Sequence, residues 1–187
     1  DLALGEQPFE VGLYLGRAGS PNTLEDARRA LELLREHPTP DLSRLGNPVQ
    51  IRICVWCGTP LGPEDHAIPE KADVCQARCP KPGCEFGSGL PWFVVDTDLY
   101  KRRPGLIIGT VDKFAGLAWK EDAGRLFNRG AGDEYGIDLI IQDELHLIAG
   151  PLGTLTGLFE TVIDELGTNP RGKRPKVIAS TATIRRA

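Results

Sequence analysis

Apolar residues in this chain form two kinds of pattern. Short continuous runs predict buried strands, and they lie at residues 9–16, 92–100, 106–108, 137–141 and 176–179. Apolar residues at spacings of three and four predict amphipathic helices over residues 24–36 and 152–166. Because buried runs alternate with helices, the pattern predicts an α/β fold, a parallel sheet with helices on both faces.

The first helix carries local signals at both ends. Asn22 or Thr23 is placed to cap its start, and Asp26 follows Thr23 at the spacing of a capping pair. The segment "HPTP" then ends the helix, since proline cannot continue it.

Residues 38–89 have a different texture, rich in proline, glycine and cysteine and poor in periodic apolar positions. Such a segment is not expected to form a hydrophobic core of its own. We therefore expect residues 49–89 to be an insertion organised by a metal, and residues 1–48 and 90–187 to form the α/β domain around it.

The insertion contains two turns typical of a zinc ribbon, "CVWCG" and "CPKPGCEF". Gly58 and Gly83 allow tight turns in which backbone N–H groups reach the sulfur atoms. A structural Zn²⁺ site is thus predicted from four thiolates, those of Cys54, Cys57, Cys79 and Cys84.

Several alternatives stay open in this segment. The cysteines could simply be reduced and buried, and Cys75 or, less readily, His66 could replace one of the ligands. The segment could contact DNA or a protein through its basic residues Arg52, Lys71, Arg78 and Lys81, or these could be a solvated face. For the aromatic residues Trp56, Trp92 and Trp119, packing is the expectation and base stacking the alternative.

Polar side chains follow three of the predicted strands. In parallel sheets, ligands bind beyond the carboxyl ends of the strands. Asp143 could hold Mg²⁺ through water, and Glu144 could polarise the water that attacks a nucleoside triphosphate. His146 could link this site to the hydroxyl groups of "STAT", among them Thr181 and Thr183.

The third strand end, "GTVDKF", could grip a backbone phosphate at the start of a helix, with Lys113 adding charge. Each signal also has a plain structural interpretation: Asp143 and Thr110 as helix caps, and "STAT" as a strand-edge cluster. A zinc hydrolase is disfavoured because Asp143, Glu144 and His146 lack the HExxH spacing.

Composition narrows the class of protein. The 187 residues are 41% hydrophobic, enough for a globular core, and 22 basic against 26 acidic residues give a charge of −4, so nucleic-acid contact would depend on local patches. No apolar stretch is long enough for a membrane helix, and no secretory signal is present at the start, so we expect a cytoplasmic protein. Five cysteines, an odd number, suit a metal site in a reducing compartment.

The blocks "VGLYLGRAGSPNTLEDA", "CVWCGTPL", "GTVDKFAGLAW", "IIQDELHLIAGPLGTLTGLFE" and "KVIASTATIRRA" resemble the superfamily 2 DExH helicases of the bacterial DISARM anti-phage system. The resemblance implies a RecA-like first motor domain of an ATP-dependent DNA helicase. It implies a magnesium-coordinating Asp143, a catalytic base at Glu144, coupling of ATP turnover to DNA by His146, Thr181 and Thr183, and a DNA strand contact at Thr110, Asp112 and Lys113. It also implies single-stranded or duplex DNA and a partner protein of the same defence system.

One departure from the helicase pattern matters. These 187 residues contain neither a GxxxxGK[ST] motif nor a second motor domain. We therefore expect the phosphate-binding loop to lie upstream, and the 187 residues alone to be inactive in ATP hydrolysis and unwinding. The alternative function is a noncatalytic zinc-ribbon module on an α/β scaffold that binds nucleic acid or protein.

Overall fold

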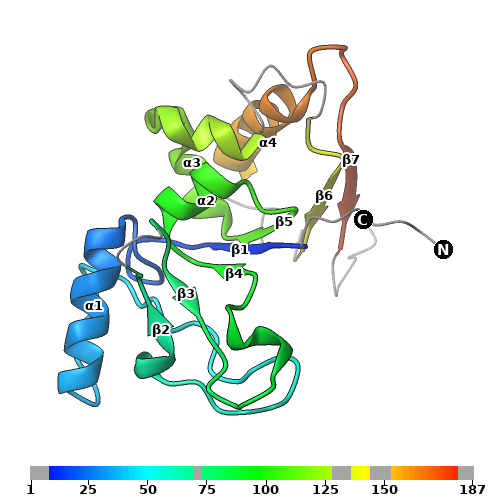
Figure 1. The fold of residues 1–187 in the computed structure, drawn as a ribbon. Helices are drawn as coiled ribbons and strands as arrows, with labels where there is room; N and C mark the ends of the chain where they lie inside the picture. Colours follow the sequence, from blue (N-terminus) through cyan, green and yellow to red (C-terminus); the bar gives the residue numbers. More distant parts are fainter. Residues whose placement is uncertain (1–8, 70–72, 128–135, 144–152, 181–187) are drawn as a thin grey trace. The chain divides into compact units, whose positions relative to one another are not determined.

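The computed structural model describes residues 9–69, 73–127, 136–143 and 153–180 (Figure 1). The chain divides into two compact units, Asp1–Lys113 and Phe114–Ala187. Each unit contains a parallel sheet and helices, so the predicted α/β class is confirmed. In the described part of the chain, no helix has both the length and the apolar character needed to cross a membrane.

The sheet of the first unit has three parallel strands in the order β4–β1–β5: Trp92–Phe93, Val11–Tyr14 and Leu106–Gly109. Val11 pairs with Trp92 on one side and with Leu106 on the other. The central strand β1 is therefore hydrogen-bonded along both edges. Its Gly12 lies under helix α2, where an added Cβ would come 2.7 Å from Leu99 Cδ2.

Helix α1 spans Leu24–Glu36, as the sequence predicts. The Thr23 hydroxyl accepts a hydrogen bond from the Asp26 N–H at 3.1 Å, which satisfies a backbone donor in the first turn. The buried face of the helix carries Ala27 and Leu31, which pack with Val94 and with other residues of unit 1. The predicted cap and the predicted apolar stripe are both confirmed.

The predicted strand over residues 92–100 is wrong beyond Phe93. Helix α2 occupies Asp96–Arg102, and Leu99 N–H donates to Val95 O at 3.0 Å in its first turn. Two aspartates begin this helix and two basic residues end it, an arrangement that favours a helix through its dipole. The apolar run "WFVV" stops at Val95, and apolar residues resume at Leu99 and Tyr100 inside this helix, so the run of mostly apolar positions did not separate the strand from the helix.

The cysteine-rich segment forms small elements in unit 1: η1 Pro63–Asp65, β2 His66–Ala67, β3 Gln76–Ala77 and η2 Glu85–Gly87. Strands β2 and β3 pair antiparallel. Contrary to expectation, the segment has a small core of its own, built from Cys54, Leu61, Ala77, Cys79 and Leu90. Trp92 packs against both this core and the core under α1, so the two cores meet at this residue.

Further contacts attach this segment to the helices. Arg35, in the last turn of α1, donates to the carbonyl of His66 at 2.8 Å. The Cys75 N–H donates to Asp98 Oδ2 of α2 at 2.9 Å. Both contacts join residues far apart in sequence, which the periodicity of either helix does not reveal.

Helix α3, Val111–Ala115, crosses the division between the units and is followed by the 3₁₀ segments η3 Gly116–Trp119 and η4 Glu121–Phe127. The second unit also contains β6 Leu139–Gln142, α4 Gly153–Gly167 and β7 Lys176–Ala179. Strands β6 and β7 pair in parallel, with Ile141 opposite Ile178.

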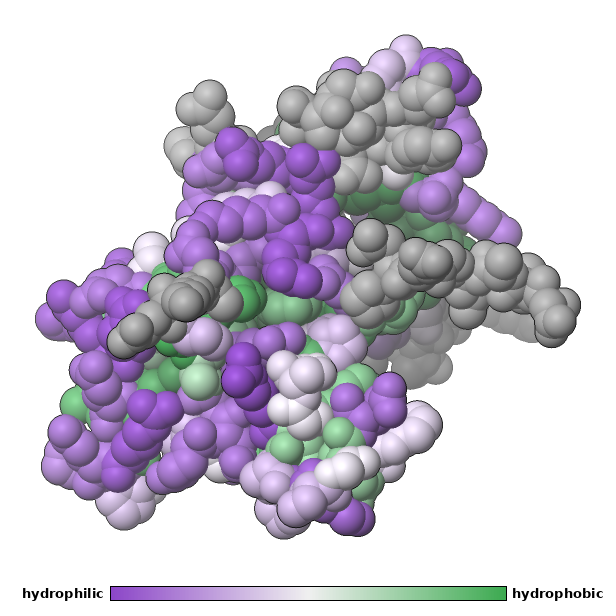
Figure 2. All heavy atoms as spheres, viewed as in Figure 1, coloured by the Kyte–Doolittle hydropathy of each residue, from purple (hydrophilic) through white to green (hydrophobic). Residues whose placement is uncertain are grey.

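The second sheet leaves apolar side chains exposed, including Ile141 at 64% and Val177 at 57%. The sequence predicts these strands as buried on both faces, but only two strands form this sheet in the described part of the chain. Hydrophobic residues are also visible between hydrophilic ones on the face drawn in Figure 2.

Candidate metal centre and strand ends

The two cysteine turns depend on glycines in a left-handed backbone conformation. Gly58 follows Cys57 with φ of 72°, and Gly83 precedes Cys84 with φ of 75°. Residues with a Cβ rarely adopt such angles, so glycine is the residue that permits both turns. The tight turns predicted at these two positions are confirmed.

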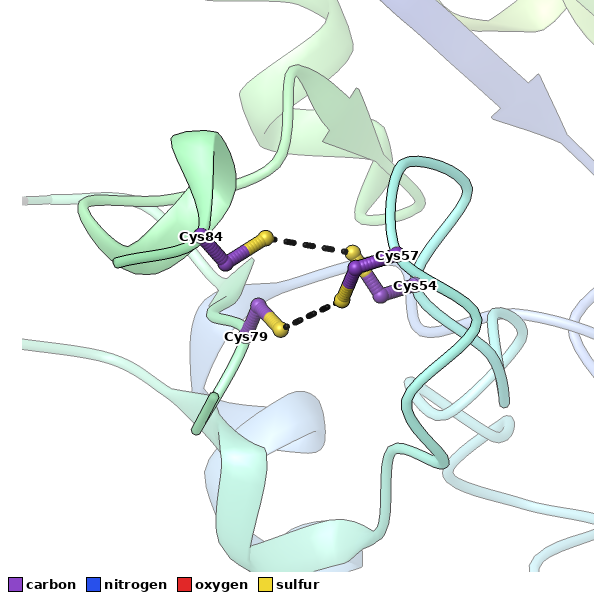
Figure 3. A group of neighbouring side chains, drawn as sticks. All are labelled: Cys54, Cys57, Cys79 and Cys84. Carbon is purple, nitrogen blue, oxygen red and sulfur yellow. Dashed lines mark hydrogen bonds between the residues drawn. The ribbon is translucent and has the colours of Figure 1, made fainter. Parts of the chain in front are cut away.

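These turns bring four sulfur atoms together (Figure 3). The Sγ atoms of Cys54, Cys57, Cys79 and Cys84 all lie within 4.8 Å of one another. Cys54 and Cys84 are 3.8 Å apart at Sγ, and Cys57 and Cys79 are 3.5 Å apart, whereas a disulfide requires about 2.0 Å. Four sulfurs at the Zn–S distance form a tetrahedron with edges of about 3.8 Å, so this donor set fits Zn²⁺.

Backbone N–H groups surround the sulfurs. Cys57 accepts from the backbone of Thr59, Cys79 from that of Lys81 and Cys84 from that of Phe86, in each case two residues further along the chain. The Thr59 hydroxyl also lies 3.1 Å from Cys57 Sγ. Such donors stabilise thiolates and fix their orientation, so they favour metal binding although they would not contact the metal themselves.

Without a cation, the thiols do not all ionise together. Hydrogen bonds from Thr59 lower the pKa of Cys57 to about 6. Burial raises the pKa of Cys79. At Cys84 the Phe86 N–H favours the thiolate, but burial and the neighbouring thiols outweigh it and raise the pKa to about 12. A divalent cation would offset the repulsion among four thiolates.

Both alternative ligands lie outside the cluster. Cys75 is buried against α1, where burial, and then the charge of Asp98, raise its thiol pKa to about 12. His66 is 3% exposed, its Nδ1 is 2.8 Å from Gly62 O, and burial lowers its pKa. Cys75 and His66 therefore have structural surroundings of their own.

The tryptophans differ from one another. Trp92 packs between the two cores, as expected. Trp56, for which packing in the core or at the knuckle was predicted, is 69% exposed, so it is not a core residue and its packing is at the knuckle. Its ring makes one edge contact with Phe86, at 6.4 Å between centroids. Trp56 lies in the tight turn between Cys54 and Cys57, and the small core on which these cysteines border does not include it. The side chain of Trp119 is outside the described part of the structure.

In the second unit, the structure brings two of the predicted strand ends side by side. Gln142 pairs with Ala179, and the Ser180 N–H donates to Gln142 O at 2.8 Å. Asp143 therefore follows β6 at the edge where Ser180 follows β7, and the Asp143 side chain is exposed. The remaining predicted residues of this site, Glu144, His146, Thr181 and Thr183, lie outside the described residues.

In the first unit, Thr110 follows β5, and its N–H donates to Tyr14 O at 3.3 Å. Thr110 and Asp112 are exposed, but the side chain of Lys113 is only 7% exposed. Lys113 Nζ lies 2.6 Å from Asp96 Oδ2 and donates to Asn22 Oδ1 at 3.0 Å. The Lys113 charge is therefore neutralised inside the unit.

A buried polar network surrounds this ion pair. Tyr14 and Tyr100 are 3.1 Å apart at their hydroxyl oxygens, and Tyr100 donates to Asp96 Oδ2 at 3.5 Å. Burial raises the pKa of both tyrosines, which keeps them neutral donors. The network joins β1, α2 and α3. Sequence reasoning missed Asp96 because it assigned this residue to a strand.

Comparison with known proteins places the chain beside one curated relative. It is 34% identical to "DISARM protein DrmA" of Bacillus paralicheniformis (strain ATCC 9945a / NCIMB 11709 / CD-2), in an alignment of 224 residues that covers 99% of this chain. The chain spans about a fifth of that protein, 20% of its length. No family model matches the chain. The predicted resemblance to a DISARM protein is confirmed.

Proposed function

We propose, from the likeness to DrmA, that this chain is part of an ATP-dependent DNA helicase or translocase of an anti-phage defence system. The identity along nearly the whole chain is the observation that carries the proposal. The proposed partners are single-stranded or duplex DNA and a second protein of the same system, and the proposed compartment is the cytoplasm.

The strand ends of the second unit are the proposed nucleotide site. Asp143 would coordinate Mg²⁺, and Glu144 would act as the catalytic base toward water. His146, Thr181 and Thr183 would couple turnover to DNA. The adjacency of Asp143 and Ser180 supports this proposal, because it brings the beginnings of both motifs to one edge of a parallel sheet.

In the first unit, fewer residues are proposed to contact DNA than the sequence suggested. Thr110 and Asp112 are exposed beyond β5 and remain candidates. Lys113 would have to leave its ion pair with Asp96 before it could meet a phosphate. We therefore propose Thr110 and Asp112 for strand contact and a positioning role for Lys113.

The four cysteines are the proposed structural zinc site. When bound, Zn²⁺ would cross-link the two turns and contribute to folding free energy. The cysteines supply all four ligands, which leaves no open coordination position for catalysis. Magnesium and ATP belong to the proposed motor site only.

Because the 187 residues lack a GxxxxGK[ST] loop, we propose that they do not hydrolyse ATP by themselves. The test therefore uses the full-length gene product. Glu144→Gln should leave ATP binding within about twofold and reduce DNA-stimulated hydrolysis by at least about a hundredfold, the scale of removing a residue that acts on the reacting atoms.

Glu160→Gln is the matched control, since Glu160 is exposed on α4, where it accepts a hydrogen bond from Gln142. It should leave turnover close to that of the unchanged protein. Unchanged ATP hydrolysis by the Glu144→Gln variant would show that Glu144 is not the catalytic base. A full-length protein that binds DNA without any ATPase activity would instead support the noncatalytic zinc-ribbon module.

A further inference from the structure

The first cysteine turn presents apolar side chains to solvent. Val55 is 72% exposed, Trp56 69% and Ile53 58%, and all three lie beside or between the ligands Cys54 and Cys57. Isolated exposed apolar residues need no explanation, but three within four positions form a patch, which suits contact with another molecule. We call these three residues, Ile53, Val55 and Trp56, the knuckle tip.

The backbone beneath the knuckle tip is fixed. Cys54 N–H donates to Thr59 O at 2.8 Å, Gly58 N–H donates to Cys54 O at 2.9 Å, and Ile53 forms a bridge with Pro60. The edge contact with Phe86, at an interplanar angle of 78°, holds the indole while most of its surface remains exposed. A ring held in this way loses little conformational entropy when another flat ring stacks on it.

Cations flank both turns. Arg52 precedes the first, while Arg78 and Lys81 lie on either side of Cys79, and all three are exposed. Within the described residues, none of these three side chains forms an ion pair. Across residues 50–61 and 76–90 the one acidic residue is Glu85, although the whole chain has a charge of −4. The side chains around the cluster are therefore locally basic.

Four thiolates with one Zn²⁺ would be net negative, but the sulfurs face inward and accept backbone N–H bonds. The outward charge is therefore that of the basic side chains. An exposed indole among cations matches a chain that offers both flat apolar rings and negative charges. Single-stranded nucleic acid has both, whereas the bases of a duplex are stacked on one another and unavailable to the indole.

We propose that the knuckle tip binds single-stranded nucleic acid, with a base stacked on Trp56 and phosphates contacted by Arg52, Arg78 and Lys81. The inference rests on the proposed zinc site but not on ATP turnover. It adds a contact surface separate in sequence from Thr110 and Asp112.

The test uses the zinc-loaded 187-residue chain without nucleotide, and the probe is a fluorescein-labelled oligothymidine of about 20 nucleotides. Trp56→Ala should weaken binding, read by anisotropy, about tenfold or more, and Trp56→Phe should retain most of it. Phe9→Ala is the matched control, since Phe9 is an aromatic residue of unit 1 that is 68% exposed outside the cluster. It should leave affinity unchanged.

Charge is tested by the salt dependence of the same binding. Replacing both Arg52 and Lys81 by Gln should reduce the slope of log affinity against log salt by about 0.7 for each lost phosphate contact. Arg44→Gln, an exposed arginine elsewhere in the unit, should leave that slope unchanged. Zinc content of each variant is measured in parallel, so that a misfolded turn is recognised.

Equal oligothymidine affinity in Trp56→Ala and the unchanged chain, with zinc retained, would overturn the proposal and assign the knuckle tip to a protein partner. The proposal would also be overturned if Trp56→Ala weakened binding to a duplex of the same length by the same factor as binding to oligothymidine, since stacking requires unpaired bases. Neither result bears on the Glu144→Gln assay, so the two proposals fail separately.

Discussion

Lys113 Nζ lies 2.6 Å from Asp96 Oδ2, and the two side chains are 7% and 2% exposed. The lysine also lies over the Tyr14 ring, at 4.8 Å from its centroid, and donates to Asn22. A single buried ammonium thus joins the end of β1, the turn before α1 and the start of α2 to the turn that carries Thr110. Its charge is balanced by Asp96 inside the unit, so the role of Lys113 in this structure is to hold these elements together.

Lys113→Met should destabilise the protein strongly, because it leaves the Asp96 carboxylate buried without its cation. The loss of a partner from a buried ion pair costs about 3–5 kcal/mol. Urea unfolding followed by circular dichroism measures the change. Lys101→Met is the matched control: Lys101 pairs with Asp73 at the surface, where its side chain is 49% exposed, and its loss should cost less than about 1 kcal/mol.

The double variant Asp96→Asn/Lys113→Met should recover part of this loss, since neither charge then remains buried. The control is the single variant Asp96→Asn. If the double variant loses as much unfolding free energy as Asp96→Asn and Lys113→Met lose together, the two side chains are not energetically coupled, and the ion pair does not explain the stability of this turn.

Asp98 should make stability depend on pH. Burial raises the pKa of this carboxyl to about 6, despite the hydrogen bond from the Cys75 N–H that favours the carboxylate. Since the folded pKa lies above the unfolded value of 3.8, the folded state keeps the proton longer, and stability falls as pH rises from about 4 to about 6. The change corresponds to roughly 3 kcal/mol for a group that is 1% exposed.

Asp98→Asn should remove this contribution while its amide oxygen still accepts the Cys75 N–H. The difference in unfolding free energy between the variant and the unchanged protein should therefore grow in favour of the variant from pH 4 to pH 7. Glu32→Gln, an exposed site on α1, serves as the control with no such trend. A constant difference across this range would contradict the raised pKa.

Zinc removal should unfold the cysteine-rich segment first. The purified chain is expected to hold one Zn²⁺, and chelation should abolish amide-exchange protection across residues 50–90 while α1 and β1 stay protected. Because Trp92 packs against both cores, some loss of protection at β4 should accompany it. Loss of protection throughout the first unit would show that the segment is not a separable element.

The choice of ligands can be tested with a matched pair of cysteine changes. Cys54→Ser should reduce zinc content to well below one ion per chain, whereas Cys75→Ser, at an equally buried cysteine, should retain it. Zinc loss in the Cys75 variant without loss of fold would contradict the four-cysteine assignment.

Gly46 should tolerate no side chain. Its φ is +77°, and an added Cβ would lie 2.3 Å from the Ser20 carbonyl carbon, which is backbone and has no rotamer to change. Gly46→Ala should cost clearly more than the roughly 1–2 kcal/mol of a left-handed backbone conformation, measured by thermal unfolding. Gly172→Ala isolates the backbone cost, because Gly172 has φ of +78° and open space around it. Equal costs at the two sites would rule out the clash.

Several features of this protein could be predicted from its sequence because they depend on interactions between residues that are close along the chain. The Thr23 cap acts on an N–H three positions away, and each cysteine turn needs only a glycine and two thiols at fixed spacing. The parallel pairing of β6 with β7 followed from apolar runs separated by a helical stripe. These features depend on neighbours in sequence, so pattern and spacing were sufficient to predict them.

Other features depend on what lies opposite each residue in space, and only the tertiary structure decided them. An apolar run can enter a strand or a helix, and the choice at α2 followed from contacts such as Asp96 N–H with Pro21 O. Lys113 resembled a surface cation until folding placed Asp96 beside it. Trp56 resembled a core residue, but the first cysteine turn holds it outward. Burial and ion pairing are properties of the folded chain, because they depend on residues that sequence distance does not relate.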